Sequence, residues 1–381
     1  MVKIDIPNGN YIKGIEVNSD HLAVDFQPKK RVALLFVSIN LNYWPYLKQV
    51  IEDCRTNFLP HHNVDYFVWS DMPAKDSPEY QAKLSSLIPQ QEFDAFVAQT
   101  GARPNGQFFS REQVQASIDY LQTQKDIIVT ETEGIEWPAP TLMRYHLFLQ
   151  QEEKLKDYDY VFYLDADMRV VQKISDEILG EGLTVAEHPM YSLRKEYIPP
   201  YEPNKNSQAY IPRLGVLSNE GGKSRFRALY IAGGFQGGKS ADFIKAMQTM
   251  KESIDIDFHN NYVAIWNDES HWNKYVLDHA NPIDGHPTVV LGPEYIYPDS
   301  LVKEYYEPIW GRKLEPKIIT LTKPFTLSKQ AASEINTFLG KEQTFHCPTC
   351  KDGFDAPGHK IVRVVNCPGS GKPHQMDLQK I

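Results

Sequence analysis

The 381-residue sequence contains little cysteine and no long apolar run. Its four cysteines are too few for a disulfide scaffold. No window approaches the roughly 18 consecutive apolar residues of a membrane span, and the N-terminus lacks the positive start and apolar centre of a signal peptide. These absences predict a soluble, cytoplasmic protein without a membrane anchor.

Positive charge is also in short supply, because 40 basic residues face 49 acidic ones and the formal net charge is -9. Nucleic acid and anionic membranes both require a basic surface, so the composition argues against either as a partner. An anionic substrate would need a local source of positive charge. The chain shows no internal repeat, and its length suits one large α/β domain with an appendage.

What the chain does contain is an alternation of apolar runs and helical periodicity. Residues 31–40 form a continuous apolar run, which is typical of a strand covered on both faces. Residues 64–73 predict a second strand. Between the two runs, one helical face carries Leu47, Val50, Ile51, Cys54 and Phe58. A strand, a helix and a strand in succession predict a parallel sheet.

The same patterns predict the later elements. They are loops and short helices outside the core at 74–110, a helix at 140–155, a strand at 159–164, a strand and loop at 182–191, a mobile loop at 198–230, a strand, glycine turn and helix at 231–254, a helix at 267–279 and a strand at 287–299. The predicted class is therefore α/β, with helices flanking a largely buried sheet.

Two aspartates, Asp165 and Asp167, follow the buried strand and are separated by Ala166. In an extended chain both carboxylates would face one point while Ala166 faces away. Open α/β sheets bind ligands at the carboxyl ends of their strands. Because two adjacent carboxylates repel each other and hard oxygen donors suit Mn²⁺ or Mg²⁺, we expect a divalent cation there, bridging to a nucleotide diphosphate.

Other interpretations of the individual motifs stay open on the residues alone. An Asp-x-Asp pair after an apolar strand also opens phosphatases that form an aspartyl-phosphate, although the sequence does not convincingly place their remaining motifs. Asp268 and Glu269 can simply be acids at a helix start, where they favour the helix dipole. The glycines of 232–238 indicate either a plain turn or a backbone that approaches a ligand closely. A lone histidine such as His188 is more often structural.

Five stretches, taken together, resemble glycosyltransferase family 6, the family of the histo-blood-group A and B transferases and α-1,3-galactosyltransferase. They are "YVFYLDADM", "EHPMY", "SQAYIP", "YIAGGFQGG" and "WNDESHWNKYVLDH", in that order and at similar spacing. The similarity covers about residues 31–325. It implies a GT-A fold, a Rossmann-like mixed sheet flanked by helices. It also implies metal-dependent transfer of N-acetylgalactosamine or galactose from a UDP-sugar, in α-1,3 linkage with retained configuration, to a glycan with a terminal galactose.

The resemblance also implies roles for individual residues. Asp165 and Asp167 would bind Mn²⁺ (or Mg²⁺) and the diphosphate, and Glu269 would lie beside the anomeric carbon. Asp268 would bind donor hydroxyls. The other donor and UDP positions are Phe36, Val37, Ser38, Tyr43, Arg144, Ala166, Ala232, Gly233, Gly234 and Lys323. His188 and Trp266 would bind the acceptor. Small residues at Ala232 and Gly234 would leave room for an acetamido group, which favours UDP-N-acetylgalactosamine over UDP-galactose.

The missing anchor and intact aspartates fit a bacterial- or phage-type member. A carbohydrate or nucleotide-sugar binding protein without turnover is the alternative from another class. We divide the chain into an N-terminal extension at 1–30, a GT-A catalytic domain at 31–330 and a C-terminal extension at 341–381. In that last segment Cys347, Cys350 and Cys367, with His374 or His359, are candidates for a structural Zn²⁺ site, and a thiol cluster or disulfide is the alternative.

Overall fold

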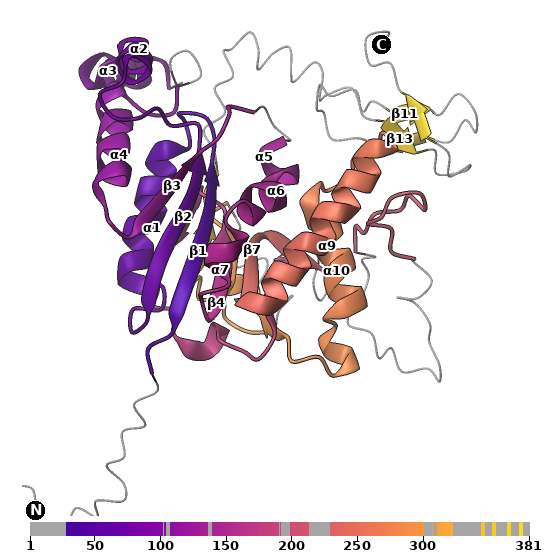
Figure 1. The fold of residues 1–381 in the computed structure, drawn as a ribbon. Helices are drawn as coiled ribbons and strands as arrows, with labels where there is room; N and C mark the ends of the chain where they lie inside the picture. Colours follow the sequence, from indigo (N-terminus) through magenta and orange to yellow (C-terminus); the bar gives the residue numbers. More distant parts are fainter. Residues whose placement is uncertain are drawn as a thin grey trace, which may run out of the picture.

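A seven-stranded mixed sheet runs through the computed structural model (Figure 1). The structure describes residues 28–101, 103, 107–135, 139–189, 191, 199–212, 229–300, 307 and 311–322, and the backbone of four short strands between 344 and 375. In spatial order the sheet consists of β3 (Ile127–Glu131), β2 (Asn63–Ser70), β1 (Arg31–Ser38), β4 (Tyr160–Leu164), β7 (Ile231–Lys239), β6 (Leu183–Glu187) and β8 (Val289–Leu291). The first four are parallel, and β7 runs antiparallel to both β4 and β6.

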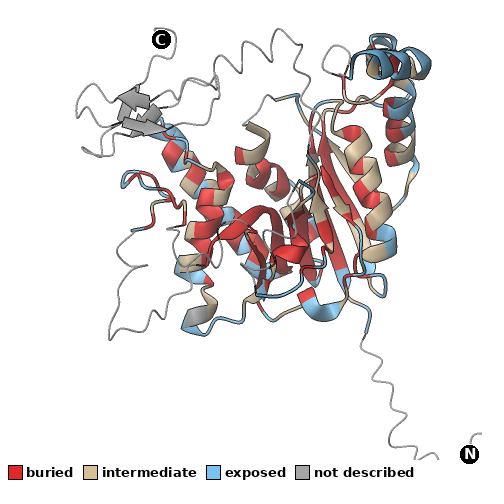
Figure 2. Ribbon diagram, turned by 180° about the vertical axis from the view of Figure 1, so that it is seen from behind, coloured by how far each residue is buried: buried red, intermediate tan, exposed pale blue. Residues whose placement is uncertain are grey.

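Helices cover both faces of this sheet. On the side of β1 to β3 they are α1 (Trp44–Asn57), α2 (Pro78–Ser85), α3 (Gln90–Thr100) and α4 (Arg111–Thr123). The others are α5 (Ala139–Leu142), α6 (Arg144–Leu149), α7 (Glu152–Leu155), α9 (Ser240–His259) and α10 (Asp268–His279), with 3₁₀ turns η3 (Asp176–Ile178), η4 (Pro282–Asp284) and η5 (Pro293–Tyr295). In Figure 2 the buried residues concentrate in the sheet and on the helix faces turned toward it.

β1 shows why the apolar runs become central strands. Val32, Leu34 and Phe36 pack with α1 and α4 on one face, whereas Ala33 and Leu35 pack with α9 and α10 on the other. All five side chains are fully buried. A strand between two helical layers needs apolar residues at every position, so the continuous run that predicted this strand is confirmed.

The predicted helix after β1 is confirmed as well. Its four predicted core residues Leu47, Val50, Ile51 and Cys54 are fully buried in α1, and Phe58 packs immediately after the helix ends. The 74–110 interval was expected to stay outside the core, and this is wrong. Its side chains Tyr80, Leu84 and Leu87 join the core beside α4. The apolar residues there are sparse because α2 buries only a narrow face.

Two predicted elements differ in detail. The expected helix at 140–155 is three short helices, α5, α6 and α7, and no proline or glycine in 141–155 marks the breaks. The expected glycine turn is absent, because β7 continues through Gly237 and Gly238 directly into α9. A Cβ atom at either glycine would overlap the neighbouring strand segments at Phe162 and Gly182, so these glycines permit close strand packing.

Part of the predicted mobile loop is folded. Within 199–212, Glu202 bridges to Tyr210, and the Ser207 hydroxyl donates a hydrogen bond of 2.6 Å to the buried carboxylate of Asp257 on α9. A buried carboxylate such as that of Asp257 needs hydrogen-bond donors. Because Ser207 supplies one, this contact holds the segment 199–212 against α9. Residues 213–228 lie outside the described residues, as does the predicted N-terminal extension up to residue 27.

Smaller sheets complete the fold. β5 (Met168–Val170), β10 (Ile318–Thr320) and β9 (Tyr297–Pro298) form one, while β11 (Thr344–His346) with β12 (Gly353–Asp355) and β13 (Val364–Asn366) with β14 (Pro373–Gln375) form two antiparallel pairs. No helix among the described residues has the length and apolar character needed to cross a membrane.

Candidate active site

A cavity of about 300 Å³ opens where β1 and β4 end. Its lining consists of Val37, Ile39, Asn40, Tyr43, Ile135, Pro140, Thr141, Arg144, Tyr163, Asp165, Ala166 and Asp167. The cavity thus combines residues from the first and fourth strands with residues that precede and begin α6. Its position at the carboxyl ends of parallel strands is the usual ligand position of an open α/β sheet.

The aspartate pair lies in a turn, not in extended backbone. β4 ends at Leu164, and Ala166 and Asp167 form the turn that leads into β5. The expectation that Ala166 faces away from the site is therefore wrong, since it lines the cavity together with both acids. The strand stops here because the chain must turn to pair β5 with β10.

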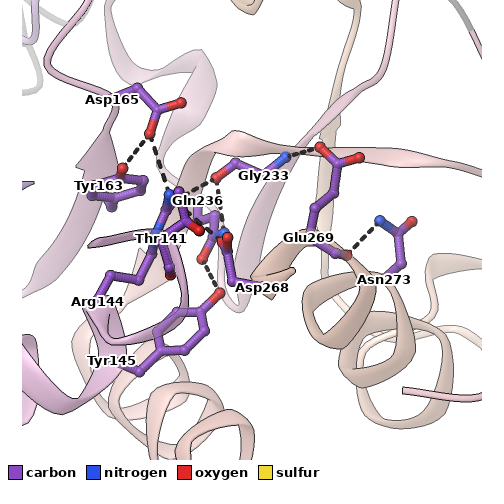
Figure 3. A network of polar contacts seen from close by, with 10 residues as sticks. All are labelled: Thr141, Arg144, Tyr145, Tyr163, Asp165, Gly233, Gln236, Asp268, Glu269 and Asn273. Atoms are coloured by element: carbon purple, nitrogen blue, oxygen red, sulfur yellow. Dashed lines mark hydrogen bonds and ion pairs between the residues drawn. The ribbon is translucent and has the colours of Figure 1, made fainter. Parts of the chain in front are cut away.

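Asp165 is held by two neighbours. The Tyr163 hydroxyl donates a hydrogen bond to its carboxylate, and the guanidinium of Arg144 lies 3.5 Å away (Figure 3). The Asp165 backbone N–H donates to the Gly234 carbonyl at 3.0 Å, which ties the acidic turn to β7. One third of the Asp165 side chain stays exposed to the cavity, so the carboxylate is accessible to a ligand.

Arg144 connects this turn to α10. Its Nη1 lies 3.3 Å from an Asp268 carboxylate oxygen and also donates to the Gly233 carbonyl at 3.2 Å. Both Arg144 and Asp268 are at least 95% buried. A buried ion pair needs such additional hydrogen bonds to offset the cost of desolvating two charges. The guanidinium therefore joins two acids that are more than one hundred positions apart in the sequence.

Glu269 is fixed at both oxygens. The Tyr230 hydroxyl donates to Oε1 and the Gly233 backbone N–H donates to Oε2, each at 2.7 Å. One turn later on the same helix, the Asn273 amide donates to the Glu269 carbonyl at 2.9 Å. As Figure 3 shows, Glu269 and Asp268 approach Gly233 from the start of α10. Gly233 is thus bound to Glu269 through its N–H and to Arg144 through its carbonyl.

A strained turn precedes the acid pair. Asn267 has φ 52° and ψ -129°, and the Glu269 N–H donates to the Trp266 carbonyl at 3.1 Å. Positive φ at the first central residue of a hydrogen-bonded turn is the pattern of a type II′ turn, in which glycine is the preferred residue. The turn directs the two successive acids of α10 into the same site.

Burial dominates the electrostatics of both acids. It raises the pKa of Asp268 to about 7, opposed by Arg144 and reinforced by Asp165 and Glu269. It also raises the pKa of Glu269 to about 7, opposed by the hydrogen bonds from Tyr230 and Gly233 and by Arg144. Carboxyl groups with raised pKa values are typical of functional sites. The cavity lining does not include either acid, and Arg144, which does line the cavity, connects it to Asp268.

Most of the predicted donor residues lie at or beside this site. Val37, Tyr43, Arg144 and the stretch 165–167 line the cavity, whereas Phe36 is buried in the core and its side chain does not reach the cavity. Ser38 is fully buried too, and its carbonyl accepts a hydrogen bond from the Ser70 hydroxyl. Because alternate residues of β1 point to opposite faces, three consecutive positions cannot all face one ligand.

The small residues of β7 have packing reasons of their own. A Cβ atom on Gly234 would lie 2.7 Å from an Asp165 oxygen and 2.6 Å from Met168 Cε, and one on Gly233 would lie 3.0 Å from the Glu269 Cβ. Ala232 is buried in the core. These glycines therefore allow β7 to pass close to both acidic elements, and this packing accounts for their small size without any ligand.

The two predicted acceptor residues meet at one aromatic cluster. His188 lies against Tyr191 and Tyr230, with ring centroids 4.6 and 5.6 Å apart, and Trp266 packs against the group formed by Tyr201, Ile211 and Tyr230. The His188 backbone N–H donates to the Tyr230 carbonyl at 2.9 Å. Burial lowers the pKa of His188 to about 4, so its ring is neutral at physiological pH.

Several predictions fall outside the described residues. They concern Lys323, Cys347, Cys350, Cys367 and His359, and His374 is described only as part of the backbone of β14. The structural Zn²⁺ site therefore stays a prediction, as does the division of the chain into domains.

Sequence reasoning missed the hydroxyls and amides that hold the acids. Tyr163 lies two positions before Asp165, and Asn273 lies four positions after Glu269, so strand and helix spacing respectively offered a signal for each. Gln236, which donates to the Gly233 carbonyl and accepts from the Tyr145 hydroxyl, gave no such signal. Tyr230 gave no such signal either, because its partner Glu269 is 39 positions away in the sequence.

A second hollow, of about 400 Å³, lies between α2 and α4 and shares no residue with the acidic cavity. Three of its charged groups have partners within the protein: Lys75 lies 3.3 Å from Asp119, and Arg111 donates to the carbonyls of Leu84 and Leu87. We therefore place the functional site at the acidic cavity, although the other hollow is larger.

The mixed sheet flanked by helices, with its acidic cavity at the ends of β1 and β4, has the architecture of a GT-A fold. The model of glycosyltransferase family 6 matches residues 109–306, just over half of the chain. The chain belongs to this family.

Relatives of the chain include the rat histo-blood group ABO system transferase 1, which is 26% identical over 75% of this chain and 66% of its own length. The Escherichia coli O-antigen biosynthesis glycosyltransferase WbnI is 31% identical over 41% of this chain and 62% of its own length. The human globoside α-1,3-N-acetylgalactosaminyltransferase 1 is 29% identical over 51% of this chain and 48% of its own length. The chain thus spans about two thirds or less of these three relatives.

Proposed function

We propose that this chain is a metal-dependent, retaining glycosyltransferase that moves N-acetylgalactosamine or galactose from a UDP-sugar in α-1,3 linkage to a galactose-type acceptor. The observation that carries the proposal is the position of Arg144, whose guanidinium lies within ion-pair distance of both Asp165, in the acidic turn after β4, and Asp268, the first residue of α10. A diphosphate site and a sugar site would then share one cavity wall.

The residues present suit a divalent cation. In the part of the chain that the structure describes, no three His, Cys, Asp or Glu side chains gather into a metal-binding group. Mn²⁺ or Mg²⁺ nevertheless needs only one or two carboxylates when substrate phosphates and water complete its shell, and Asp165 and Asp167 both line the cavity. When bound, such a cation supplies charge neutralisation to the departing diphosphate.

The acids of α10 suit the sugar. Asp268 would accept hydrogen bonds from donor hydroxyls while its charge is balanced by Arg144. Retention of configuration requires either a carboxylate nucleophile or attack from the same face through an ion-pair-like transition state. In both cases a negative Glu269 beside the anomeric carbon stabilises the positive charge that develops there.

Donor and acceptor identity rest on the relatives and on the site. Three relatives, from chicken, human and mouse, are named globoside α-1,3-N-acetylgalactosaminyltransferase 1, which supports N-acetylgalactosamine as the sugar. The glycines of β7 are compatible with this sugar but do not require it, because their packing against Asp165 and Glu269 accounts for their size. His188 and Trp266 would bind the acceptor beside Tyr230.

The test is release of UDP from a panel of UDP-sugars, with a terminal-galactose oligosaccharide as acceptor. We expect acceptor-stimulated release from UDP-N-acetylgalactosamine or UDP-galactose with Mn²⁺, and at least a 100-fold decrease after chelation. Asp167→Asn should abolish the Mn²⁺-dependent part of UDP binding. Transfer that continues unchanged in chelator would refute the metal role, UDP-sugar binding without release would indicate a binding protein, and phosphate release from simple monoesters would indicate a phosphatase.

A further inference from the structure

Tyr230 occupies a junction between two parts of the site. It precedes β7 immediately and is almost completely buried. Its hydroxyl donates to Glu269 at 2.7 Å, while its carbonyl accepts from the His188 N–H at 2.9 Å. Tyr230 therefore contacts both the proposed catalytic carboxylate of Glu269 and the backbone of His188, which is proposed to bind the acceptor.

The surroundings of Tyr230 fix the direction of its hydroxyl. Its ring packs against His188, Tyr191 and Tyr201, with centroids 5.4 to 5.6 Å apart. The next residue, Ile231, exchanges two hydrogen bonds with the Asn273 amide, at 2.9 and 2.8 Å. The Asn273 amide also donates to the Glu269 carbonyl. The side chain of Asn273 therefore connects the backbone at the start of β7 to the backbone at the start of α10.

We propose that Tyr230 is a positioning residue that fixes the rotamer of Glu269 for cleavage of the donor and couples that rotamer to the acceptor wall at His188. A carboxylate on a flexible side chain has several rotamers, and only hydrogen bonds to both of its oxygens select one. The Gly233 N–H supplies one of them, and Tyr230 supplies the other. The inference rests on the proposed transferase function.

Other charged groups also act on Glu269 and must stay constant in a test. They are Asp165 after β4, Arg144 on α6 and the adjacent Asp268, and Tyr230→Phe leaves all three side chains in place. Tyr230→Phe removes this hydroxyl alone and keeps the ring in the aromatic cluster. Tyr160→Phe is a matched control, because its side chain is also buried but its hydroxyl donates to the Gly180 carbonyl at 3.0 Å, and it belongs to neither the cavity lining nor the aromatic cluster at His188.

The experiment compares steady-state transfer, pH profile and thermal midpoint in the two variants and the wild type. Loss of a hydrogen bond to a charged group costs about 1.5–3 kcal/mol, so kcat of Tyr230→Phe should fall roughly 10- to 150-fold, with the acceptor KM changed less than about threefold. The acid limb of its kcat profile should move to higher pH, because the hydrogen bond to the ionised carboxylate is lost. Tyr160→Phe should lower the thermal midpoint while kcat and the acid limb stay unchanged.

Three outcomes would overturn the inference: wild-type kcat and pH profile in Tyr230→Phe, equal losses in both variants, or a loss confined to KM. An inactive wild type across all donors would instead refute the proposed function. If Tyr230→Phe does not fold, 3-fluorotyrosine at position 230 tests the same contact. It keeps the hydroxyl and strengthens it as a donor, so the acid limb should move to lower pH, and an unmoved limb would contradict the proposal.

Discussion

The guanidinium of Arg144 lies 3.3 Å from the carboxylate of Asp268, and both side chains are about 95% buried. This pair joins the short helix α6 to the first residue of α10 beneath the cavity. Arg144 can be replaced while Asp268 is kept, so the contribution of this buried ion pair to stability can be measured.

Arg144→Met should be strongly destabilising at pH 8. It leaves Asp268 as a buried charge without a cation, which costs about 3–5 kcal/mol of unfolding free energy. The loss should be smaller at pH 5, where Asp268, with its pKa raised to about 7, is protonated in the folded protein. Urea unfolding in chelator at the two pH values measures both effects.

A control for this prediction is Arg169→Met. Arg169 pairs with Asp53 at 2.5 Å but has 37% of its side chain exposed, so its loss should cost about 1 kcal/mol or less. Equal destabilisation by the two substitutions would show that burial of the Arg144 pair is not what matters.

The acids of α10 should make the folded protein less stable as pH rises from about 4 to about 7. Their pKa values are near 7 in the folded state and near 4 when unfolded, so the folded state binds more protons in this window. Each such group changes the unfolding free energy by up to about 1.4 kcal/mol per pH unit. Unfolding in chelator should therefore show a shallower negative slope for Glu269→Gln than for the wild type, and identical slopes would contradict the raised pKa of Glu269.

Asn267 should respond to substitution according to its positive φ. Asn267→Gly relieves strain and should raise stability by about 1 kcal/mol while retaining transfer activity, whereas Asn267→Val should cost about 2–3 kcal/mol and lower kcat at least tenfold. The reason is that a β-branched residue cannot hold the turn that directs Asp268 and Glu269 into the site. Thermal unfolding and kcat are the two measurements.

The control for this prediction is Asn261, which also has a positive φ, at 60°, and follows α9 on the surface. Asn261→Gly and Asn261→Val should change stability in the same directions but leave kcat unaltered. A wild-type kcat for Asn267→Val would show that the turn does not position the acids.

Local patterns of apolar residues in the sequence predicted much of the fold. The apolar run of β1 predicts a strand buried on both faces, and the periodicity of residues 47–58 predicts the face that α1 buries, because burial on two faces or on one face imposes a recognisable spacing. The family resemblance likewise follows from the order of short motifs. The helix breaks between α5 and α7 and the continuation of β7 through Gly237 and Gly238 have no such local mark.

The sequence by itself determined which residues are candidates: the acids Asp165, Asp167, Asp268 and Glu269, together with Arg144. The tertiary structure alone decided how they meet. The chain turns at Ala166 and Asp167 and leads into β5, which pairs with β10, and the Glu269 carboxylate takes its direction from Tyr230 and Gly233, both more than thirty positions away in the sequence. Periodicity encodes which side of an element is buried, but contacts between distant elements depend on packing that no local spacing records.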